Sequence, residues 1–198
     1  MASYYDKVLE PILWKMRRKI IKISNLKEGM KVLEVACGTG TQALRFKKAG
    51  AVYTGVDLSP AMLNMAEKRN LECLHADGTK LPLADSTFDL STITLALHEV
   101  DYEISKQIIL EMLRVTKQEG FLVLVDYTVP QKKSLFSGIG DKSIHYIEKR
   151  VGGSHYRNYK KFMKSGGLVS FLESFDLKIS EKNLIFGGNI GIIKVKNR

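Results

Sequence analysis

The chain has 198 residues, a formal net charge of +10, two cysteines and an ordinary proportion of apolar residues. Its length suits one domain with a sizeable core, and no apolar run is long enough to span a membrane. The first residues lack the regions of a secretory signal, and the cysteines lack the spacing of a zinc site. We therefore expect a single domain over residues 1–198, in a reduced cytoplasmic setting, without a metal site.

The first predicted element is an amphipathic helix over residues 4–23. Apolar residues recur there at steps of three and four positions, which places them on one face of a helix. Basic residues fall largely outside this face, so we expect a helix packed on the core with a solvated basic side. A membrane-surface helix is the alternative. The apolar stripe consists of Leu9, Leu13, Met16, Ile20 and Ile23.

Strand and helix patterns then alternate along the chain. Short apolar runs predict buried strands, and segments with helical periodicity separate them. Regular alternation of this kind predicts an α/β fold with a mainly parallel sheet covered by helices. We expect strands at residues 32–36, 51–56, 71–76, 88–97 and 120–129, helices at 41–48, 59–70, 103–117 and 167–174, and a hairpin with arms at 175–180 and 190–196.

The first predicted strand ends in a glycine-rich turn, Gly38-Thr39-Gly40. Glycine lets the backbone approach a ligand closely because no Cβ intervenes. Glu34 lies inside the strand, where a buried carboxylate is costly unless a cation or a hydrogen-bond donor meets it. This combination favours a ligand that carries an ammonium group close to the glycines.

Two further acids follow the second and third predicted strands. Asp57 lies about twenty residues beyond the glycines, the position that binds a ribose diol in Rossmann-type units. Asp77 and Gly78 can hold an adenine edge through one carboxylate oxygen and one backbone N–H. One strand-end acid is more often a turn former or a helix cap, but two in consecutive units after a glycine turn favour a nucleotide site.

A nicotinamide cofactor is the alternative. Gly38, Gly40 and Ala43 also satisfy the loose dinucleotide pattern. Tyr156 and Lys160 match the Tyr-x-x-x-Lys pair of short-chain reductases, although the same spacing recurs elsewhere in this lysine-rich chain. The glycine spacing of that reductase family is absent. A nicotinamide cofactor would also leave Glu34, inside the first strand, unexplained.

Four motifs stand in order along roughly residues 30–129. They are Val32-Leu-Glu-Val-Ala-Cys-Gly-Thr-Gly40, Val56-Asp-Leu-Ser-Pro-Ala-Met-Leu63, Ala76-Asp-Gly-Thr-Lys-Leu-Pro-Leu-Ala-Asp-Ser-Thr-Phe-Asp89 and Glu119-Gly-Phe-Leu122. Together they resemble class I S-adenosylmethionine-dependent methyltransferases, most closely the branch that includes ubiquinone and menaquinone biosynthesis. The resemblance implies a Rossmann-like fold with a seven-stranded, mostly parallel sheet, an antiparallel last strand and helices on both faces.

The resemblance also implies roles for individual residues. Glu34 and the glycine turn would hold the methionine end of S-adenosylmethionine, Asp57 the ribose hydroxyls, and Asp77 the adenine edge. The cofactor-binding residues implied in this way are Tyr5, Glu34, Ala36, Cys37, Gly38, Gly40, Asp57, Leu58, Met62, Asp77, Gly78 and Leu95.

Catalysis of methyl transfer requires mainly that a nucleophile is held in line with the sulfonium methyl group, and a general base can assist. Asp126 and His145 are also candidate bases, but the catalytic residues that we favour are His98, after the fourth strand, and His155 and Tyr156. The last two lie in residues 130–165, which we expect to form an inserted lid or substrate segment. Residues 1–25 are expected to form an N-terminal helical cap.

The predicted acceptor is a small molecule, such as a quinone precursor or a lipid-like compound. No Asn/Asp-Pro-Pro-aromatic sequence follows the fourth strand, so the amino-group methylases of nucleic acids are not matched. An RNA methyltransferase that uses the basic surface remains an alternative, and an NAD(P)-dependent reductase is a weaker one. The net positive charge also admits an anionic membrane surface as a peripheral partner. The oligomeric state is not indicated.

Overall fold

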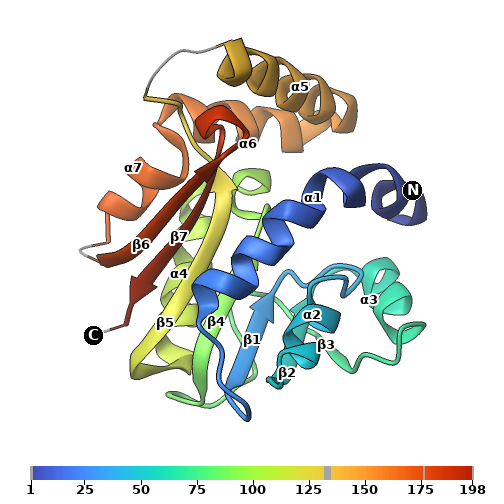
Figure 1. The fold of residues 1–198 in the computed structure, drawn as a ribbon, viewed down its shortest axis with the longest axis vertical. Coiled ribbons are helices and arrows are strands. Elements are labelled where there is room, and N and C mark those ends of the chain that lie inside the picture. The colour runs from blue at the N-terminus through green and yellow to red at the C-terminus, as the bar shows by residue number, and fades with distance from the viewer. Residues whose placement is uncertain (1, 132–134, 176, 198) are drawn as a thin grey trace.

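The computed structural model describes residues 2–131, 135–175 and 177–197, with the backbone alone at residues 2–12, 135–137 and 139. In this part of the chain seven strands form one sheet in the order β3-β2-β1-β4-β5-β7-β6 (Figure 1). The strands are β1 (Lys31–Val35), β2 (Val52–Asp57), β3 (Cys73–His75), β4 (Phe88–Thr94), β5 (Thr116–Tyr127), β6 (Lys178–Ile185) and β7 (Ile190–Lys196).

The described helices connect these strands and cover the sheet. They are α1 (Ala2–Ser24), α2 (Ala43–Lys48), α3 (Pro60–Glu67), α4 (Tyr102–Val115), α5 (Leu135–Val151), α6 (Gly153–Lys164) and α7 (Gly167–Glu173), with short 3₁₀ turns η1 (Leu97–Glu99) and η2 (Phe186–Gly188). None of the described helices is both long and apolar enough to cross a membrane.

The direction of the strands confirms the predicted fold. β1 pairs in parallel with β2 and β4, and β3 and β5 continue the parallel arrangement on the far sides of β2 and β4. β7 is antiparallel to both of its neighbours, β5 and β6. The hairpin of β6 and β7 was expected; its first arm, predicted at residues 175–180, is Lys178–Ile185 in the structure.

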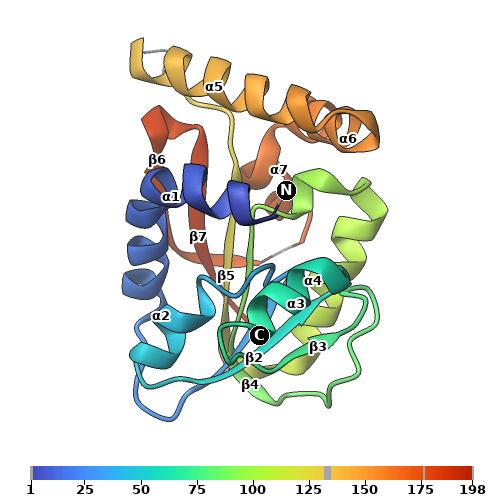
Figure 2. The ribbon, with the colours of Figure 1, turned by 90° about the vertical axis from the view of Figure 1, so that its right-hand side faces the viewer.

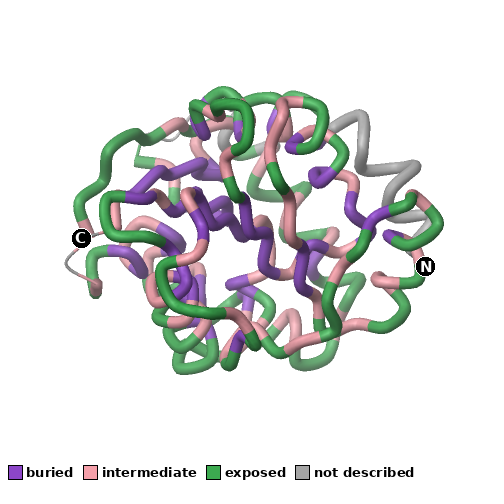
Figure 3. The backbone as a smooth tube through the Cα atoms, turned by 90° about the horizontal axis from the view of Figure 1, so that it is seen from below, coloured by how far each residue is buried: buried purple, intermediate pink, exposed green. Residues whose placement is uncertain are grey.

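Both faces of the sheet are buried, as continuous apolar strands require. Alternate residues of β5 serve the two faces: Leu122 and Leu124 pack in the cluster with α4 and α7, and Val123 and Val125 in the cluster with α1. All four are fully buried, because β5 lies inside the sheet between β4 and β7. Figure 3 shows the buried backbone gathered in the middle of the molecule, with exposed segments around it.

The N-terminal helix is confirmed as a core-packed element. The described members of its predicted stripe are Leu13, Met16, Ile20 and Ile23, and each is at most 8% exposed. The side chain of Leu9 lies outside the described part. The predicted packing of α1 against the sheet therefore holds for the four residues that can be compared.

Several element boundaries differ from the prediction. β4 ends at Thr94 rather than at residue 97, because Leu95 has a φ of 53° and the chain turns out of the strand into η1. The third strand, expected at residues 71–76, is only Cys73–His75. β5 begins at Thr116, where we expected the end of a helix. Local periodicity does not set such limits, since pairing with the neighbouring strand decides them.

Residues 130–165, whose secondary structure the sequence does not predict, contain α5 and α6. These two helices lie across the carboxyl-terminal end of the parallel strands (Figure 2). α6 packs on η1, which follows β4, and also against α7. The segment therefore stands over the edge of the sheet at which ligands bind in α/β folds.

Candidate active site

The turn after β1 adopts the conformation that its glycines allow. Gly38 and Gly40 have φ values of 57° and 75°, and Ala36 also has a positive φ, of 53°. These angles are easily reached by glycine but strained for other residues. Cys37, between Ala36 and Gly38, is buried and donates its N–H to the carbonyl oxygen of Val56 at 3.0 Å. The turn is therefore tied to the end of β2.

Arg69 fixes the second half of the same turn. Its guanidinium Nη1 donates to the carbonyl oxygen of Thr39 at 2.8 Å and to the hydroxyl of Thr41 at 2.6 Å. Arg69 follows α3, so this contact joins two successive strand–helix units. Sequence reasoning missed it, because an arginine just after a helix carries no signal of its distant partner.

Glu34 is only 3% exposed, and a hydrogen-bond donor does meet it. The hydroxyl of Tyr53 on β2 donates to Glu34 Oε2 at 2.8 Å. Burial raises the pKa of Glu34 to about 8, and the Tyr53 hydroxyl and the charge of Arg17 on α1 only partly oppose this shift. The carboxyl group at the centre of the site is thus held largely protonated at neutral pH.

Asp57 closes the turn from the end of β2. Its Oδ2 accepts a hydrogen bond from the N–H of Gly38 at 2.7 Å, and its Oδ1 accepts one from the N–H of Ser59 at 2.8 Å. Ser59 in turn caps α3, since its hydroxyl accepts the N–H of Met62 at 3.4 Å. Asp57 therefore acts as a turn former here and also contacts the glycine turn.

Asp77 follows β3 and forms its own turn. Its Oδ1 accepts hydrogen bonds from the N–H and the hydroxyl of Thr79, both at 2.8 Å. These hydrogen bonds lower the pKa of Asp77. Gly78 lies against Val35, where an added Cβ would come within 3.0 Å of that side chain. Position 78 is thus adjacent to the end of β1.

The remaining predicted cofactor residues lie in three places: around the start of α3, in the turn after β4, and in α1. Leu58 is 63% exposed, and Met62 is half-buried on the first turns of α3. Leu95, half-buried after β4, has a positive φ and donates its N–H to the carbonyl oxygen of Val125 at 2.8 Å. Tyr5 lies in α1, but its side chain is outside the described part of the structure.

A second group of polar side chains is buried around His98, which lies in η1 after β4. This side chain is 2% exposed, and its Nδ1 lies 2.7 Å from Oδ1 of the fully buried Asp126, near the end of β5. The other oxygen of Asp126 accepts the backbone N–H of Leu97 at 3.0 Å. Asp126 thereby fixes both the imidazole and the turn that carries it.

Glu148 and His155 complete this group from the two covering helices. Nε2 of His98 lies 3.6 Å from Oε1 of Glu148, which is 4% exposed on α5. His155 on α6 contacts the other oxygen, Oε2, through its own Nε2. The hydroxyl of Tyr127 donates to Oε1 of Glu148 at 2.7 Å. Sequence reasoning missed Glu148 and Tyr127.

The ionisable side chains of this group shift one another's pKa values. Burial by itself lowers the pKa of His98, but the charge and hydrogen bond of Asp126, assisted by Glu148, outweigh it and raise that pKa to about 10. Burial raises the pKa of Glu148, but the charge of His98 and the hydrogen bonds of Tyr127 and His155 lower it to about 2.

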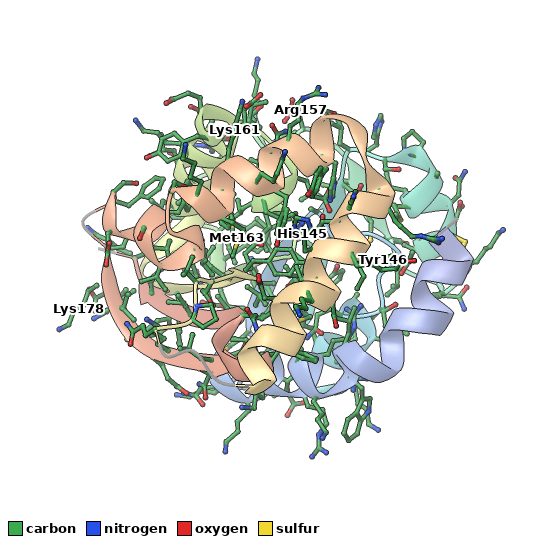
Figure 4. All side chains as sticks on the ribbon, turned by 90° about the horizontal axis from the view of Figure 1, so that it is seen from above. His145, Tyr146, Arg157, Lys161, Met163 and Lys178 are labelled. Atoms are coloured by element: carbon green, nitrogen blue, oxygen red, sulfur yellow. The ribbon has the colours of Figure 1, made fainter. Side chains whose placement is uncertain are left out.

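The structure brings two of the three predicted catalytic residues together and separates the third. The rings of His98 and His155 are 5.4 Å apart. Tyr156 instead pairs its hydroxyl with Nε2 of His145 at 2.8 Å, and Lys160 lies 4.8 Å over its ring. Figure 4 shows His145 between α5 and α6, with Arg157 and Lys161 on the outer side of α6.

The comparisons with known proteins agree with this geometry. Residues 33–124 match the family model described as a methyltransferase domain. The chain is 37% identical over 116 residues to a demethylmenaquinone methyltransferase from Paenarthrobacter aurescens, and 36% identical over 116 residues to one from Renibacterium salmoninarum. Each match covers 58% of this chain, and 45% and 48% of those relatives. The matched segment thus spans about half the length of these curated relatives.

Solved structures with low sequence identity share the fold. A SAM-dependent methyltransferase from Aquifex aeolicus aligns with a TM-score of 0.67 at 19% identity, over 100% of this chain and 99% of that one. The N-methyltransferase NodS from Bradyrhizobium japonicum, in complex with S-adenosylhomocysteine, aligns with a TM-score of 0.68 at 15% identity, over 94% and 88% of the two chains.

Proposed function

We propose that this chain is a class I S-adenosylmethionine-dependent methyltransferase and transfers the methyl group of S-adenosylmethionine to a small molecule, because residues 33–124 match a methyltransferase domain and the fold is that of a SAM-dependent methyltransferase. The observation that carries the proposal is the turn after β1. Its glycines stand beside a buried carboxyl group, and acids follow the next two strands.

The residues at this edge of the sheet fit the proposed cofactor. Glu34 has one oxygen hydrogen-bonded to Tyr53, and its buried position beside the turn suits the ammonium of the methionine end. Asp57 would exchange or share its backbone contacts to bind the ribose hydroxyls. Leu58 is an exposed apolar side chain in the same turn, available to pack against the adenine. When bound, the cofactor would supply an already activated sulfonium methyl group.

The acceptor would then approach from beneath α5 and α6. His98 and His155 are the polar side chains that we assign to contact its reacting atom, and they are held by Asp126 and Glu148. Correct orientation of this kind contributes roughly 7–11 kcal/mol toward lowering a barrier. A role for Tyr156 stays a prediction.

A ring compound such as a quinone precursor is the acceptor class that we favour. Aromatic side chains surround the histidines: the ring of Tyr127 lies 4.5 Å from that of His98, and the ring of Tyr159 lies 6.2 Å from it. Aromatic surfaces suit planar ligands. The curated relatives are named for demethylmenaquinone, which supports the same class.

Two measurements test the proposal separately. Isothermal titration of the purified protein with S-adenosylmethionine, S-adenosylhomocysteine and reduced nicotinamide cofactors should give saturable binding for the first two only. Methyl-labelled cofactor should then label a product in the small-molecule or lipid fraction of a cell extract. Binding of a nicotinamide cofactor alone would overturn the cofactor assignment, and label confined to RNA would overturn the acceptor assignment.

A further inference from the structure

We propose that His98, Glu148 and His155 form a binding site for one divalent transition-metal ion, of the kind that zinc or iron(II) occupies. Their ligand atoms all lie within 4.8 Å of one another. Each comes from a different element, namely η1, α5 and α6. The two histidines were predicted as catalytic residues, but the third ligand and the convergence of all three emerge only from the fold.

The donor set and its spacing suit such an ion. Two imidazoles and one carboxylate, with room for a further ligand, are a recurrent set for zinc and for non-haem iron(II). Nε2 of His98 and Oε1 of Glu148 are 3.6 Å apart, too far for a hydrogen bond. Two ligands that each lie ~2.1 Å from a shared tetrahedral ion stand ~3.4 Å apart. His155 presents its Nε2 to the same carboxylate.

The residues behind these three support the same arrangement. Nδ1 of His98 lies 2.7 Å from the carboxylate of Asp126, which fixes the ring and leaves Nε2 as the ligand atom once a metal ion displaces its proton. A carboxylate behind a histidine is the usual support of a metal-bound imidazole. On the opposite side, the Tyr127 hydroxyl donates to Oε1 of Glu148 at 2.7 Å and orients that carboxylate.

Charge balance also favours a cation at this place. Asp126 and Glu148 are 0% and 4% exposed, and these two buried carboxylates face the two ring nitrogens of His98. Within the described part of the chain, their charged partners are the imidazoles of His98 and His155. One divalent ion would displace the proton that His98 carries in the metal-free protein and would offset the charge of both carboxylates.

The proposed ion would have an open position. An ion with three protein ligands keeps a fourth place for water or substrate. The role of this open position in catalysis rests on the proposed methyl transfer. In that reaction it would bind an oxygen or sulfur atom of the acceptor. The expected acceptors are then compounds with a hydroxyl, enol or thiol group that can bind a metal as an anion.

The test is a metal titration of the full chain after removal of metals with a chelator. Titration with Co²⁺ should give one saturable site per chain with visible ligand-field absorption, and Zn²⁺ should displace the Co²⁺. His155→Gln should weaken binding at least tenfold, and His145→Gln is the matched control because that histidine pairs with Tyr156 instead. Asp126→Asn should weaken binding by about 10–100-fold through the supporting position alone.

The outcomes separate this inference from the proposed function. Absence of saturable binding, or equal affinity in His155→Gln and His145→Gln, overturns the metal site. Circular dichroism of each variant confirms that it is folded. The affinity of the metal-free protein for S-adenosylmethionine is measured in a separate titration. Retained cofactor binding without metal binding removes only the metal site, and metal binding without cofactor binding removes only the methyltransferase proposal.

Discussion

At the scale of single residues, the burial of Glu34 opposes the ionisation that its proposed role requires. Its carboxyl group needs a negative charge to bind an ammonium group, yet burial raises its pKa to about 8 in the unliganded protein. The sequence indicates that a donor or a cation must meet this acid. The structure identifies the donor as Tyr53 and the nearby charge as Arg17. Cys73 and Asp57, which face the same carboxyl group, push its pKa further upward.

Replacing Glu34 by Gln should change how stability depends on pH. The folded pKa lies above the unfolded value, so the folded state retains the proton and stability falls as pH rises from about 4.5 to about 8. We expect the unliganded wild-type protein to lose up to about 1.4 kcal/mol of unfolding free energy per pH unit from this group in that window. Glu34→Gln should lack this component.

Urea denaturation at a series of pH values measures the effect. Glu72→Gln serves as the control, because this acid is exposed in front of β3 and should leave the slope unchanged. Parallel stability curves for the wild type and Glu34→Gln would show that the buried carboxyl group does not hold a proton.

Replacing Asp57 by Ala should weaken cofactor binding. The change removes an acceptor for the N–H groups of Gly38 and Ser59 and a partner for the proposed ribose. We expect a loss of at least about fivefold in affinity, equivalent to ~1 kcal/mol. Calorimetric titration with S-adenosylhomocysteine measures it.

Asp89 provides a matched comparison for Asp57. Asp89 also accepts a backbone N–H, that of Lys31 at 2.8 Å, and it pairs with Lys117. It lies beside the first residue of β1, whereas the glycine turn follows the last residue of that strand. Asp89→Ala should therefore leave cofactor affinity unchanged, and equal effects of the two substitutions would contradict the assignment.

At the scale of elements, α1 is held to the sheet by its apolar stripe. Met16→Ala should lower the free energy of unfolding by about 2–5 kcal/mol, because Met16 is fully buried against the sheet and its truncation leaves a cavity. Lys15→Ala, on the exposed side of the same helix, should cost less than ~0.5 kcal/mol. Chemical denaturation compares them, and similar losses would mean that the stripe does not anchor α1.

The covering helices show where local pattern stops being informative. Residues 130–165 carry basic residues, glycines and aromatic residues without a clear period, so their secondary structure is not predictable from the sequence alone. In the structure, Tyr159 and Phe162 of α6 are buried, and Glu148 turns inward from α5. These contacts depend on how the helices lie on η1 and the sheet, which no local spacing encodes.

At the scale of the whole molecule, the charge of +10 is concentrated in part on the covering helices. Seven exposed basic residues lie there, and Figure 4 shows two of them, Arg157 and Lys161, at the outer side of α6. The seven are Lys142, Lys149, Arg150, Arg157, Lys160, Lys161 and Lys164. This surface supports the proposal of an anionic membrane as a peripheral partner.

Charge reversal tests that proposal. Arg157→Glu should reduce co-sedimentation with vesicles that contain an anionic phospholipid, and added salt should reduce it further by screening. Lys178→Glu changes the net charge by the same amount on β6, away from the covering helices (Figure 4), and should have little effect. Binding that ignores lipid charge and salt would contradict a membrane role for this surface.

The sequence by itself determined the α/β alternation, the antiparallel last strand through family resemblance, and the turn that joins Glu34 to the glycines. Short-range periodicity and residue type carry that information, because strands, turns and caps depend on neighbouring residues. Only the tertiary structure decided that Tyr53 meets Glu34, and that Glu148 and His155 meet His98. Those contacts join residues far apart in the chain, and the packing of α5 and α6 over the sheet brings them together.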